Sequence, residues 1–225
     1  MDRATTQSDV RIWRLLLVDD HPLVRFGLSR LIDDEPDLEI CGETGMISEA
    51  LELARMMLPD LAIIDLSLAD GNGLDLVKRL RAHYEDIRIL VCSMHDESLF
   101  AQRSITAGAR GYINKQEATT HIIDAIRHVL GDKVWLSQQM TERLLQGMVD
   151  GETELKVASI DKLSDRELEV FGLIGRGKGP SQIAEYLHLS VKTIETHREK
   201  IKKKLNLKSG SELSRWAIQW TMDQE

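Results

Sequence analysis

Short apolar runs alternate with stretches of helical periodicity along roughly the first 130 residues of the chain. The apolar runs are rich in Leu, Ile and Val and have the length of buried strands, which we expect at residues 13–18, 38–43, 61–65, 87–93 and 111–114. Between and after them, apolar residues recur every three or four positions, which predicts helices at residues 21–34, 47–58, 73–82, 97–107 and 117–130. Strands that alternate with helices form a parallel sheet with helices on both faces. The pattern therefore predicts a doubly wound α/β domain with a five-stranded parallel sheet over residues 12–132.

The pattern changes after residue 132. Residues 133–159 contain one amphipathic stretch, Gln138–Met148, and then a polar run, so we expect a linker with a helical segment. From residue 160 onwards the apolar spacing is helical, and we expect helices at residues 164–176, 181–187, 191–205 and 211–222. Ser164 and Glu167 have the spacing of a capping box at the start of the first of these helices. Residues 160–225 are therefore predicted to form a small all-α domain.

The composition is that of a folded globular protein, with 42% hydrophobic and 29% charged residues. The longest apolar runs, such as Leu15–Val18 and Leu61–Ile64, are far shorter than the roughly 18 residues that span a bilayer. The N-terminus has no apolar stretch of signal-peptide length, and two cysteines cannot form a disulfide framework. We therefore expect a cytoplasmic protein with no membrane partner.

Charge is distributed unevenly along the chain. The net charge of −8, taken alone, argues against a nucleic-acid partner. Residues 160–225, however, carry 12 basic and 10 acidic residues, and the segment 190–208 carries seven basic and two acidic residues. This concentration of positive charge suggests a nucleic-acid-binding module joined to an acidic domain.

Three acidic residues stand at the ends of two expected strands. Asp19 and Asp20 follow the first strand, and Asp65 ends the third. Neighbouring strands of a parallel sheet end at the same edge, where ligands bind in such folds. Carboxylates in a small volume repel one another unless a cation compensates them, so the cluster indicates a hard divalent ion, for which we expect Mg²⁺. A carboxylate beside such an ion can act as a nucleophile toward a phosphoryl group, although the simpler interpretation is that these acids only solvate loop ends.

Two further polar residues favour a site over solvated loops. Ser93 ends the fourth expected strand and Lys115 follows the fifth, so both should project at the same edge as the acids. A lysine ammonium pairs with a phosphoryl oxygen, or with the acids in its absence, and a serine hydroxyl can donate to another oxygen. Five polar residues at four strand ends of an apolar sheet are difficult to attribute to chance.

The same region resembles a known family in the motifs LLLVDDHPLVRFGL, IIDLSLADGNGLDLV, VCSMHDE and GARGYINK. These motifs are similar to those of bacterial response-regulator receiver domains, which have a flavodoxin-like fold, over about residues 12–130. The resemblance implies that Asp65 is the phospho-acceptor. It also implies that Asp19, Asp20 and Asp65 bind the magnesium ion together with the backbone carbonyl of Ser67.

The resemblance also implies how phosphorylation is sensed. Ser93 and Lys115 would contact the phosphoryl group. Tyr112 would be the switch residue, which turns inward when Ser93 moves.

A second constellation lies near the C-terminus. The expected helices 181–187 and 191–205 are separated by a three-residue turn, and their apolar positions form one continuous face, which predicts a helix-turn-helix. The opposite face of the second helix carries basic and polar residues that could contact phosphates and base edges. For a charged face alone, an ordinary solvated helix would be the simpler interpretation.

The segment LSDRELEVFGLIGRGKGPSQIAEYLHLSVKTIETHREKIKKKLNL resembles the LuxR-type helix-turn-helix, and the match runs from about residue 160 to residue 222. The resemblance implies that Glu195, Thr196 and Glu199 face base edges. It further implies phosphate contacts by the neighbouring residues Lys192, Thr193, His197, Arg198 and Lys202.

A receiver joined to this domain is typical of the NarL/FixJ class of two-component response regulators. The resemblance therefore implies a phosphorylation-dependent transcriptional regulator and not an enzyme. A sensor histidine kinase would phosphorylate Asp65, and the phosphorylated protein would form a homodimer that binds double-stranded DNA. The sequence supports no dinucleotide site, since no G-x-G-x-x-G follows the first strand, and no aspartyl phosphatase, since Asp65-Leu66-Ser67 lacks the second acid.

An alternative is a signalling interaction module in which the receiver docks proteins and the C-terminal helices serve oligomerisation. Trp216 and Trp220 lie one turn apart on the last expected helix and support this hypothesis, because exposed aromatic residues mark interfaces. Salt-dependent binding of duplex DNA would distinguish the two hypotheses.

Overall fold

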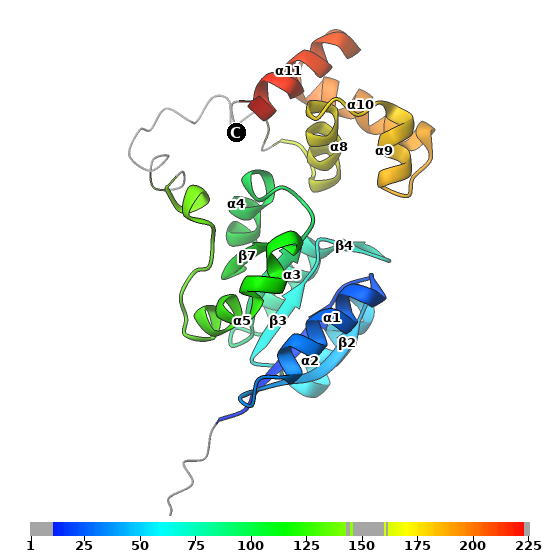
Figure 1. The fold of residues 1–225 in the computed structure, drawn as a ribbon. Coiled ribbons are helices and arrows are strands. Elements are labelled where there is room, and N and C mark those ends of the chain that lie inside the picture. Colours follow the sequence, from blue (N-terminus) through cyan, green and yellow to red (C-terminus); the bar gives the residue numbers. More distant parts are fainter. Residues whose placement is uncertain (1–10, 143–144, 146–159, 161, 223–225) are drawn as a thin grey trace, which may run out of the picture. The chain divides into compact units, whose positions relative to one another are not determined.

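The computed structural model describes residues 11–142, 145, 160 and 162–222 (Figure 1). The chain divides into two compact units, of which the first contains the chain up to Met94 together with Arg103–Leu136. The second contains His95–Gln102 and the chain from Ser137 onwards. Of the amphipathic stretch expected at Gln138–Met148, residues 138–142 are helical, and most of the expected linker 133–159 lies outside the described residues. None of the helices in the described ranges combines the length and apolarity that crossing a membrane requires.

The first unit is built on a five-stranded sheet in which each strand pairs in parallel with its neighbours. The spatial order is β2-β1-β3-β6-β7, and the strands are β1 (Trp13–Val18), β2 (Leu38–Thr44), β3 (Leu61–Ile64), β6 (Arg88–Ser93) and β7 (Gly111–Asn114). Because the order reverses at β1, the topological switch point lies between β1 and β3, where ligands bind in such sheets. The predicted five-stranded parallel α/β fold is confirmed.

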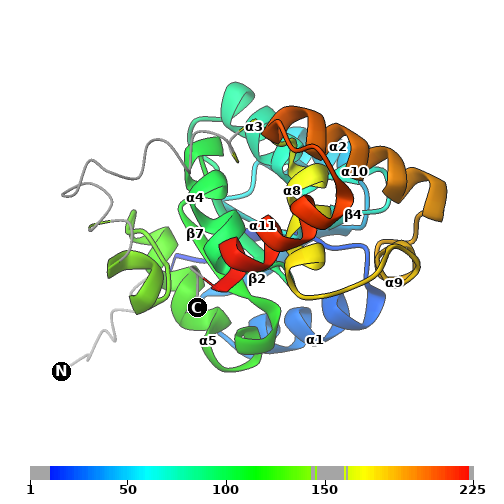
Figure 2. The same cartoon turned by 90° about the horizontal axis from the view of Figure 1, so that it is seen from above.

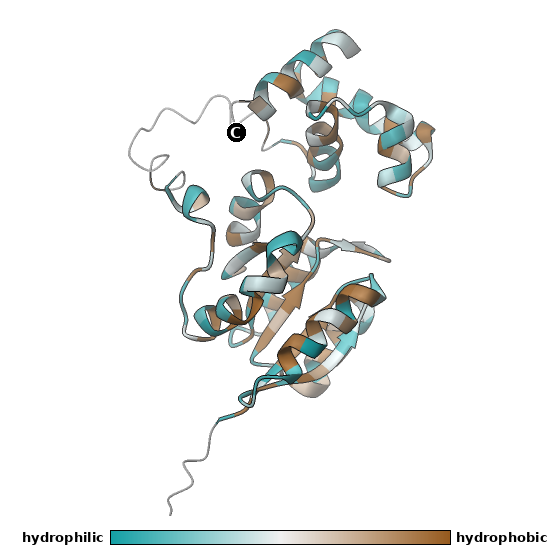
Figure 3. Cartoon of the chain, in the orientation of Figure 1, coloured by the Kyte–Doolittle hydropathy of each residue, from teal (hydrophilic) through white to brown (hydrophobic). Residues whose placement is uncertain are grey.

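Helices cover both faces of this sheet (Figure 2). The first pair, α1 (Pro22–Asp33) and α5 (Lys115–Leu130), packs on one face, and α2 (Ile47–Met57) and α3 (Gly73–His83) pack on the other. Along β1, Leu15 and Leu17 belong to the core beneath α1 and α5, while Leu16 alternates to the other face and is equally inaccessible to solvent. Burial from both sides explains why the strands are continuous apolar runs in the sequence, and the central strands are among the brown segments of Figure 3.

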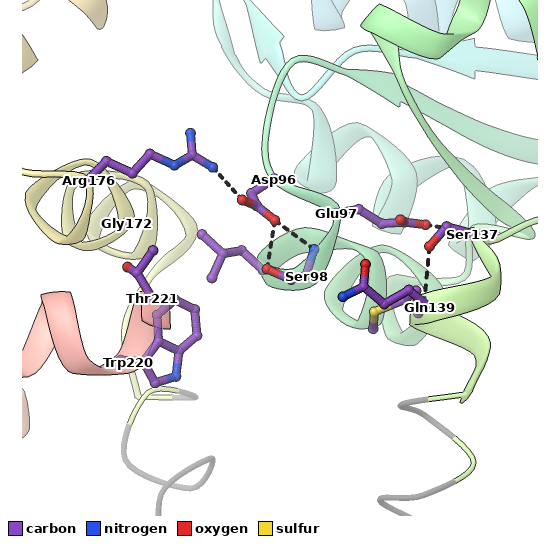
Figure 4. Close-up of a pocket in the computed structure, with 11 residues that line it drawn as sticks. Asp96, Glu97, Ser98, Ser137, Gln139, Gly172, Arg176, Trp220 and Thr221 are labelled. Carbon is purple, nitrogen blue, oxygen red and sulfur yellow. Dashed lines mark hydrogen bonds and ion pairs between the residues drawn. The ribbon is translucent and has the colours of Figure 1, made fainter. Parts of the chain in front are cut away.

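Side chains fix the start of α4 (Glu97–Ala107), as Figure 4 shows. The carboxylate of Asp96 accepts hydrogen bonds from the backbone N–H of Ser98 (3.0 Å) and from its hydroxyl (2.6 Å). Glu97 accepts a hydrogen bond from the backbone N–H of Ser137 (2.9 Å). The first turn of α4 is therefore joined to the chain that follows α5.

The second unit contains the C-terminal helices, which are α8 (Asp165–Gly175), α9 (Pro180–Tyr186), α10 (Val191–Leu205) and α11 (Gly210–Met222). The predicted capping box opens α8, where Glu167 accepts from the backbone N–H of Ser164 (2.7 Å) and the Ser164 hydroxyl accepts from the N–H of Glu167 (3.4 Å). The predicted all-α C-terminal domain is confirmed.

The two tryptophans of α11 pack within their own unit. The rings of Trp216 and Trp220 each lie 5.7 Å from the ring of Phe171 on α8. Aromatic pairs at this separation contribute beyond the area that they bury. Both tryptophans therefore pack inside their own unit and are not exposed aromatic residues in need of a partner protein. The observation that favoured an oligomerisation role no longer supports it.

Two local features differ from the sequence-based expectation. The loop after β3 contains a short antiparallel hairpin, β4 (Ser67–Leu68) and β5 (Gly71–Asn72), which is too short to be visible as a periodic pattern. Helix α5 begins at Lys115 rather than at residue 117, because the Asn114 side chain caps it by accepting from the N–H of Gln116 (3.0 Å).

Asp70, at the tip of the hairpin, caps the start of α2. Its carboxylate accepts hydrogen bonds from the backbone N–H groups of Ile47 (2.6 Å) and Ser48 (3.2 Å). Burial acts to raise the pKa of Asp70, but these hydrogen bonds hold it below its usual value. We expect Asp70→Ala to destabilise the first turn of α2 by about 1 kcal/mol, measured at neutral pH as faster amide hydrogen exchange over residues 47–50.

The matched control is Glu52→Ala, which removes an exposed acid from the same helix. Folding lowers the pKa of Asp70. The stability that this carboxylate adds to the wild type is therefore fully present above the unfolded-state pKa and is lost as the pH falls through the folded-state pKa. Equal exchange rates in Asp70→Ala and in the wild type at neutral pH would contradict the role of this carboxylate as a cap.

Candidate functional site

A cluster of acids lies at the carboxyl edge of the sheet, at the ends of β1 and β3. These strands are neighbours, with Val18 paired to Ile64, so the residues that follow them come together. One ligand atom from each of Asp19, Asp20, His21 and Asp65 lies within 4.8 Å of the others. The predicted clustering of the three carboxylates is present, and it includes a histidine that the sequence analysis did not assign to the site.

Lys115 supplies the cation of this cluster. Its Nζ lies 2.6 Å from Asp65 Oδ2 and 2.6 Å from Asp19 Oδ2, and all three side chains are almost fully buried. Burial acts to lower the pKa of Lys115, but the charges and hydrogen bonds of Asp65 and Asp19 raise it above its usual value. The ammonium therefore remains protonated, and one cation faces the negative charge of several carboxylates.

The pKa of Asp19 shows that this compensation is incomplete. Burial raises the pKa of Asp19 and the neighbouring Asp65 carboxylate raises it further, and Lys115 offsets only part of this effect. The pKa of Asp19 therefore remains above its usual value even though it forms a short ion pair. A further cation beside these oxygens would lower the electrostatic cost.

The residues present fit a divalent metal ion. Asp20 Oδ1 is buried and accepts no hydrogen bond within the part of the chain that the structure describes. The Nδ1 of His21 lies 2.7 Å from this oxygen but outside hydrogen-bonding geometry. A buried carboxylate oxygen without a donor, next to two further carboxylates, is a suitable ligand set for Mg²⁺.

Ser93 orients Asp65 from the other side. Its hydroxyl donates a hydrogen bond of 2.6 Å to Asp65 Oδ1, while Lys115 contacts Oδ2. Ser93 is the last residue of β6 and pairs with Asn114, the last residue of β7, so the two strand ends that carry these donors are adjacent. Each oxygen of Asp65 therefore has its own donor.

The remaining residues expected at this site lie close to it in the fold. Tyr112, in the middle of β7, is fully buried, so its ring is inward in this structure. Ser67 lies two residues past Asp65 and pairs with Asn72 in the short hairpin. The metal-binding role of its carbonyl stays a prediction.

Gly73, which the sequence analysis did not assign to the site, holds the backbone of Asp65 in place. A Cβ at Gly73 would lie 2.0 Å from the backbone carbonyl oxygen of Asp65. The N–H of Gly73 also donates to the carbonyl of Leu66 (2.8 Å). The start of α3 therefore approaches the backbone of Asp65 so closely that no larger side chain fits at Gly73 without moving it.

Arg25 supports the loop of the other two acids and was also not anticipated. Its guanidinium donates to the backbone carbonyl of Asp19 and lies 4.0 Å from the carboxylate of Glu43. Its place in the DDHPLVR segment, one turn into α1 from the acids, could have indicated this role.

The second candidate site is the solvent-exposed face of α10. Helix α10 buries Ile194 and Ile201 against its own unit, and Ser190 caps it by accepting from the N–H of Thr193 (3.1 Å). The opposite face exposes Lys192, Glu195, Thr196, Glu199, Lys200 and Lys203. Three of these, Glu195, Thr196 and Glu199, are the expected base-reading residues, whereas Lys200 and Lys203 had no assigned role.

Three other residues assigned to phosphates are less accessible. The side chains of Arg198 and Lys202 retain only 16% and 20% of their exposure and pair with Glu195 (3.5 Å) and Glu199 (2.7 Å). His197 is half-buried and faces α8. Burial lowers its pKa, and the charge of Arg166 lowers the pKa further. On binding, Arg198 and Lys202 would have to exchange these carboxylates for phosphates.

Comparisons with known proteins match both halves of the chain. Residues 15–127 match the model of the response regulator receiver domain, and residues 161–217 match that of the bacterial regulatory proteins of the luxR family. The transcriptional regulatory protein MctR of Rhizobium johnstonii is 33% identical over 205 residues, covering 91% of this chain and 92% of that protein. The oxygen regulatory protein NreC of Staphylococcus carnosus is 34% identical over 209 residues, covering 91% and 96%.

A solved structure of similar organisation is RcsB of Salmonella enterica serovar Typhimurium, bound to promoter rprA in the presence of the phosphomimetic BeF₃⁻. It is 25% identical, covers 92% of this chain and 99% of RcsB, and has a TM-score of 0.58. These relatives match both units in one chain.

The Arg25 contact generates a prediction for metal binding. Without the guanidinium, the loop that carries Asp19 and Asp20 loses a support outside the ligand set. We expect Arg25→Ala to weaken Mg²⁺ binding by about tenfold, because supporting groups of this kind affect metal affinity by roughly 10–100-fold. Isothermal titration calorimetry with MgCl₂ measures the change.

Two variants accompany this test. Arg30→Ala removes an exposed arginine of the same helix and should leave Mg²⁺ affinity unchanged, while Arg25→Lys should recover part of the lost affinity. Thermal unfolding of each variant establishes that it is folded. Wild-type Mg²⁺ affinity in a folded Arg25→Ala protein would show that the arginine does not position the acids.

Proposed function

The chain belongs to the response regulators that join a receiver domain to a DNA-binding domain of the luxR family, and on this premise we propose that Asp65 is the phospho-acceptor through which a sensor histidine kinase controls DNA binding. The protein is a transcriptional regulator of the two-component type. The observation that carries the proposal is the pair of donors on Asp65, Lys115 on one oxygen and Ser93 on the other.

The transfer is a displacement at phosphorus. A carboxylate oxygen of Asp65 forms a bond to the phosphorus while the bond from phosphorus to the kinase's imidazole nitrogen breaks, and the electron pair of that bond stays with the imidazole. When bound, Mg²⁺ neutralises charge on the transferred oxygens. Asp19, Asp20 and Asp65 would hold it, with the carbonyl of Ser67.

Lys115 and Ser93 change partners as a result of this step. Before the transfer, the ammonium of Lys115 contacts Asp65 Oδ2. After the transfer, it pairs with one oxygen of the phosphoryl group, and the Ser93 hydroxyl donates to another. Ser93 ends β6 and Tyr112 lies on the adjacent strand β7. A shift of Ser93 toward the phosphoryl group therefore alters the space beside Tyr112, which we propose as the switch residue.

The functional output is DNA binding by α10. Its exposed face presents two carboxylates and a hydroxyl between lysines, a combination that suits base edges flanked by phosphates. A helix-turn-helix of this kind binds half-sites as a dimer, because two linked modules of modest affinity bind more tightly together. We therefore propose that the phosphorylated protein acts as a homodimer on double-stranded DNA. RcsB, one of the solved relatives, has been described bound to promoter rprA in the presence of a phosphomimetic.

Phosphoryl uptake should depend on Asp65. Incubation of the full-length protein with acetyl phosphate and Mg²⁺ should add one phosphoryl group, detected by intact-protein mass spectrometry. Asp65→Asn should remain unlabelled, because an amide is not a nucleophile toward phosphorus here. The matched control, Asp75→Asn, changes an exposed acid at the start of α3 and should label like the wild type. Labelling of Asp65→Asn at the wild-type rate would overturn the assignment.

DNA binding should separate the residues of α10 by their roles. Lys192→Ala and Lys202→Ala should weaken binding to every duplex alike and each reduce the slope of log K against log salt by about one unit, as expected for phosphate contacts. Thr196→Ala and Glu195→Gln should instead change the preferred sequence. Fluorescence anisotropy with a panel of duplexes at several salt concentrations measures both effects, and Lys162→Ala, an exposed lysine before α8, is the control. A uniform loss of affinity in all four variants would contradict the assignment of base contacts.

A further inference from the structure

Lys204 lies in the last turn of α10, within the basic segment 190–208, but on the side away from an expected base-reading residue. Ile201, three residues earlier, is buried within the unit. Glu195, which is expected to face base edges, precedes Lys204 by nine residues, or about two and a half turns of a helix. The two side chains therefore leave α10 on opposite sides.

The partner of Lys204 is an acid on another helix. Its Nζ lies 2.6 Å from Oε2 of Glu167 in the first turn of α8. The side chain of Glu167 retains only 4% of its exposure, against 39% for Lys204, and the same oxygen accepts from the backbone N–H of Ser164 (2.7 Å). Burial acts to raise the pKa of Glu167, but these hydrogen bonds hold it below its usual value. Lys204 thus compensates a carboxylate that is shielded from water.

The ion pair joins two helix ends that both favour it. The amino end of a helix carries partial positive charge, and the carboxyl end carries partial negative charge. Glu167 stands at the amino end of α8, and Lys204 stands at the carboxyl end of α10, so each charge is stabilised by its own helix. The pair therefore ties the last turn of α10 to the first turn of α8.

The neighbouring residue of α8 holds the other helix of the motif. Arg166 donates to the backbone carbonyl of Leu187 (3.0 Å), which is the C-cap residue of α9. The last carbonyls of a helix lack partners within that helix, so this bond satisfies one of them. The turn 188–190 follows directly and leads into α10. Adjacent residues of α8 therefore contact α9 where the turn begins and α10 where that helix ends.

These two contacts determine how α10 is presented. The recognition helix of such a motif lies in the major groove while the first helix crosses the backbone, so its orientation decides which side chains reach the bases. We propose that Lys204 is a positioning residue, which fixes the orientation of α10 through its ion pair with Glu167 and does not contact a phosphate. The inference rests on the proposed function, because it takes α10 as the helix that binds DNA.

Neutralising the acid gives the sharpest test, because removal of a negative charge should by itself strengthen binding to DNA. Glu167→Gln keeps a side chain that can complete the capping box but loses the charge that holds Lys204. We expect it to weaken DNA binding by about tenfold, which corresponds to a docked orientation populated about one tenth of the time. The measurement is fluorescence anisotropy of the full-length protein, treated with acetyl phosphate and Mg²⁺, on a panel of duplexes. The matched control, Glu185→Gln, removes an exposed acid from α9 and should not weaken binding.

Variants of Lys204 distinguish positioning from a phosphate contact. Lys204→Met should weaken binding about as much as Glu167→Gln, while the slope of log K against log salt changes by much less than the roughly one unit of a lost phosphate contact. The double variant should lose no more than either single variant, because both substitutions remove the same interaction. Lys204→Arg should restore most of the affinity. Lys203→Met, at the next and exposed position, should instead combine additively with Glu167→Gln.

A titration tests the contact without DNA. Lys204→Met should raise the pKa of Glu167, followed by nuclear magnetic resonance of its side-chain carboxyl, because the ammonium helps to lower that pKa. Lys203→Met should leave it where it is in the wild type. An unchanged pKa of Glu167 in Lys204→Met would overturn the inference.

The binding outcomes separate this inference from the proposed function. Wild-type affinity in a folded Glu167→Gln protein, or a loss of about one unit of salt slope in Lys204→Met, would show that Lys204 does not position α10, and DNA binding by α10 would stand. If Lys204→Met alone does not fold, the double variant, which leaves no buried charge without a partner, provides the same comparison. If the wild type binds no duplex, the proposed function fails together with this extension.

Discussion

The ammonium of Lys115, shared between the carboxylates of Asp19 and Asp65, is the interaction on which this edge of the sheet depends. All three groups are almost completely buried, and both distances are 2.6 Å. Removing one partner from a buried ion pair typically costs about 3–5 kcal/mol, because the remaining charge loses its compensation. Here one cation serves two acids, and burial together with the charge of Asp65 keeps the pKa of Asp19 above its usual value. The same contact therefore holds the site together and leaves it short of positive charge, which favours the binding of a metal cation.

Much of this arrangement follows from the sequence. Buried parallel strands are continuous apolar runs, so their positions could be predicted, and the polar residues at their ends had to meet once the strands were parallel. This reasoning, together with the resemblance to receiver domains, predicted that four residues are neighbours, namely Asp19, Asp65, Ser93 and Lys115. Because β1 lies beside β3, Asp19 and Asp20 at the end of β1 come close to Asp65 at the end of β3.

Other features could not be predicted because they depend on close approaches between segments. The contact of Gly73 with the Asp65 carbonyl is a packing constraint, and periodicity contains no information about it. The hairpin around Asp70 is only two residues long on each side, and its role as a cap for α2 joins residues more than 20 positions apart. On α10, periodicity identified the exposed side but could not show that His197 turns toward α8 or that Arg198 and Lys202 pair with neighbouring acids.

The separation of the site residues along the chain has a consequence for folding. Lys115 and Asp65 are 50 positions apart, and Ser93 and Asp65 are 28 apart. They meet only through parallel pairings, which need long crossovers and form slowly because loop closure must precede them. An incomplete chain or a partly folded intermediate would hold Asp65 without its donors and without the other acids. The arrangement of donors and acids around Asp65 is thus a property of the finished sheet, and a chain that has not completed its parallel pairings would lack it.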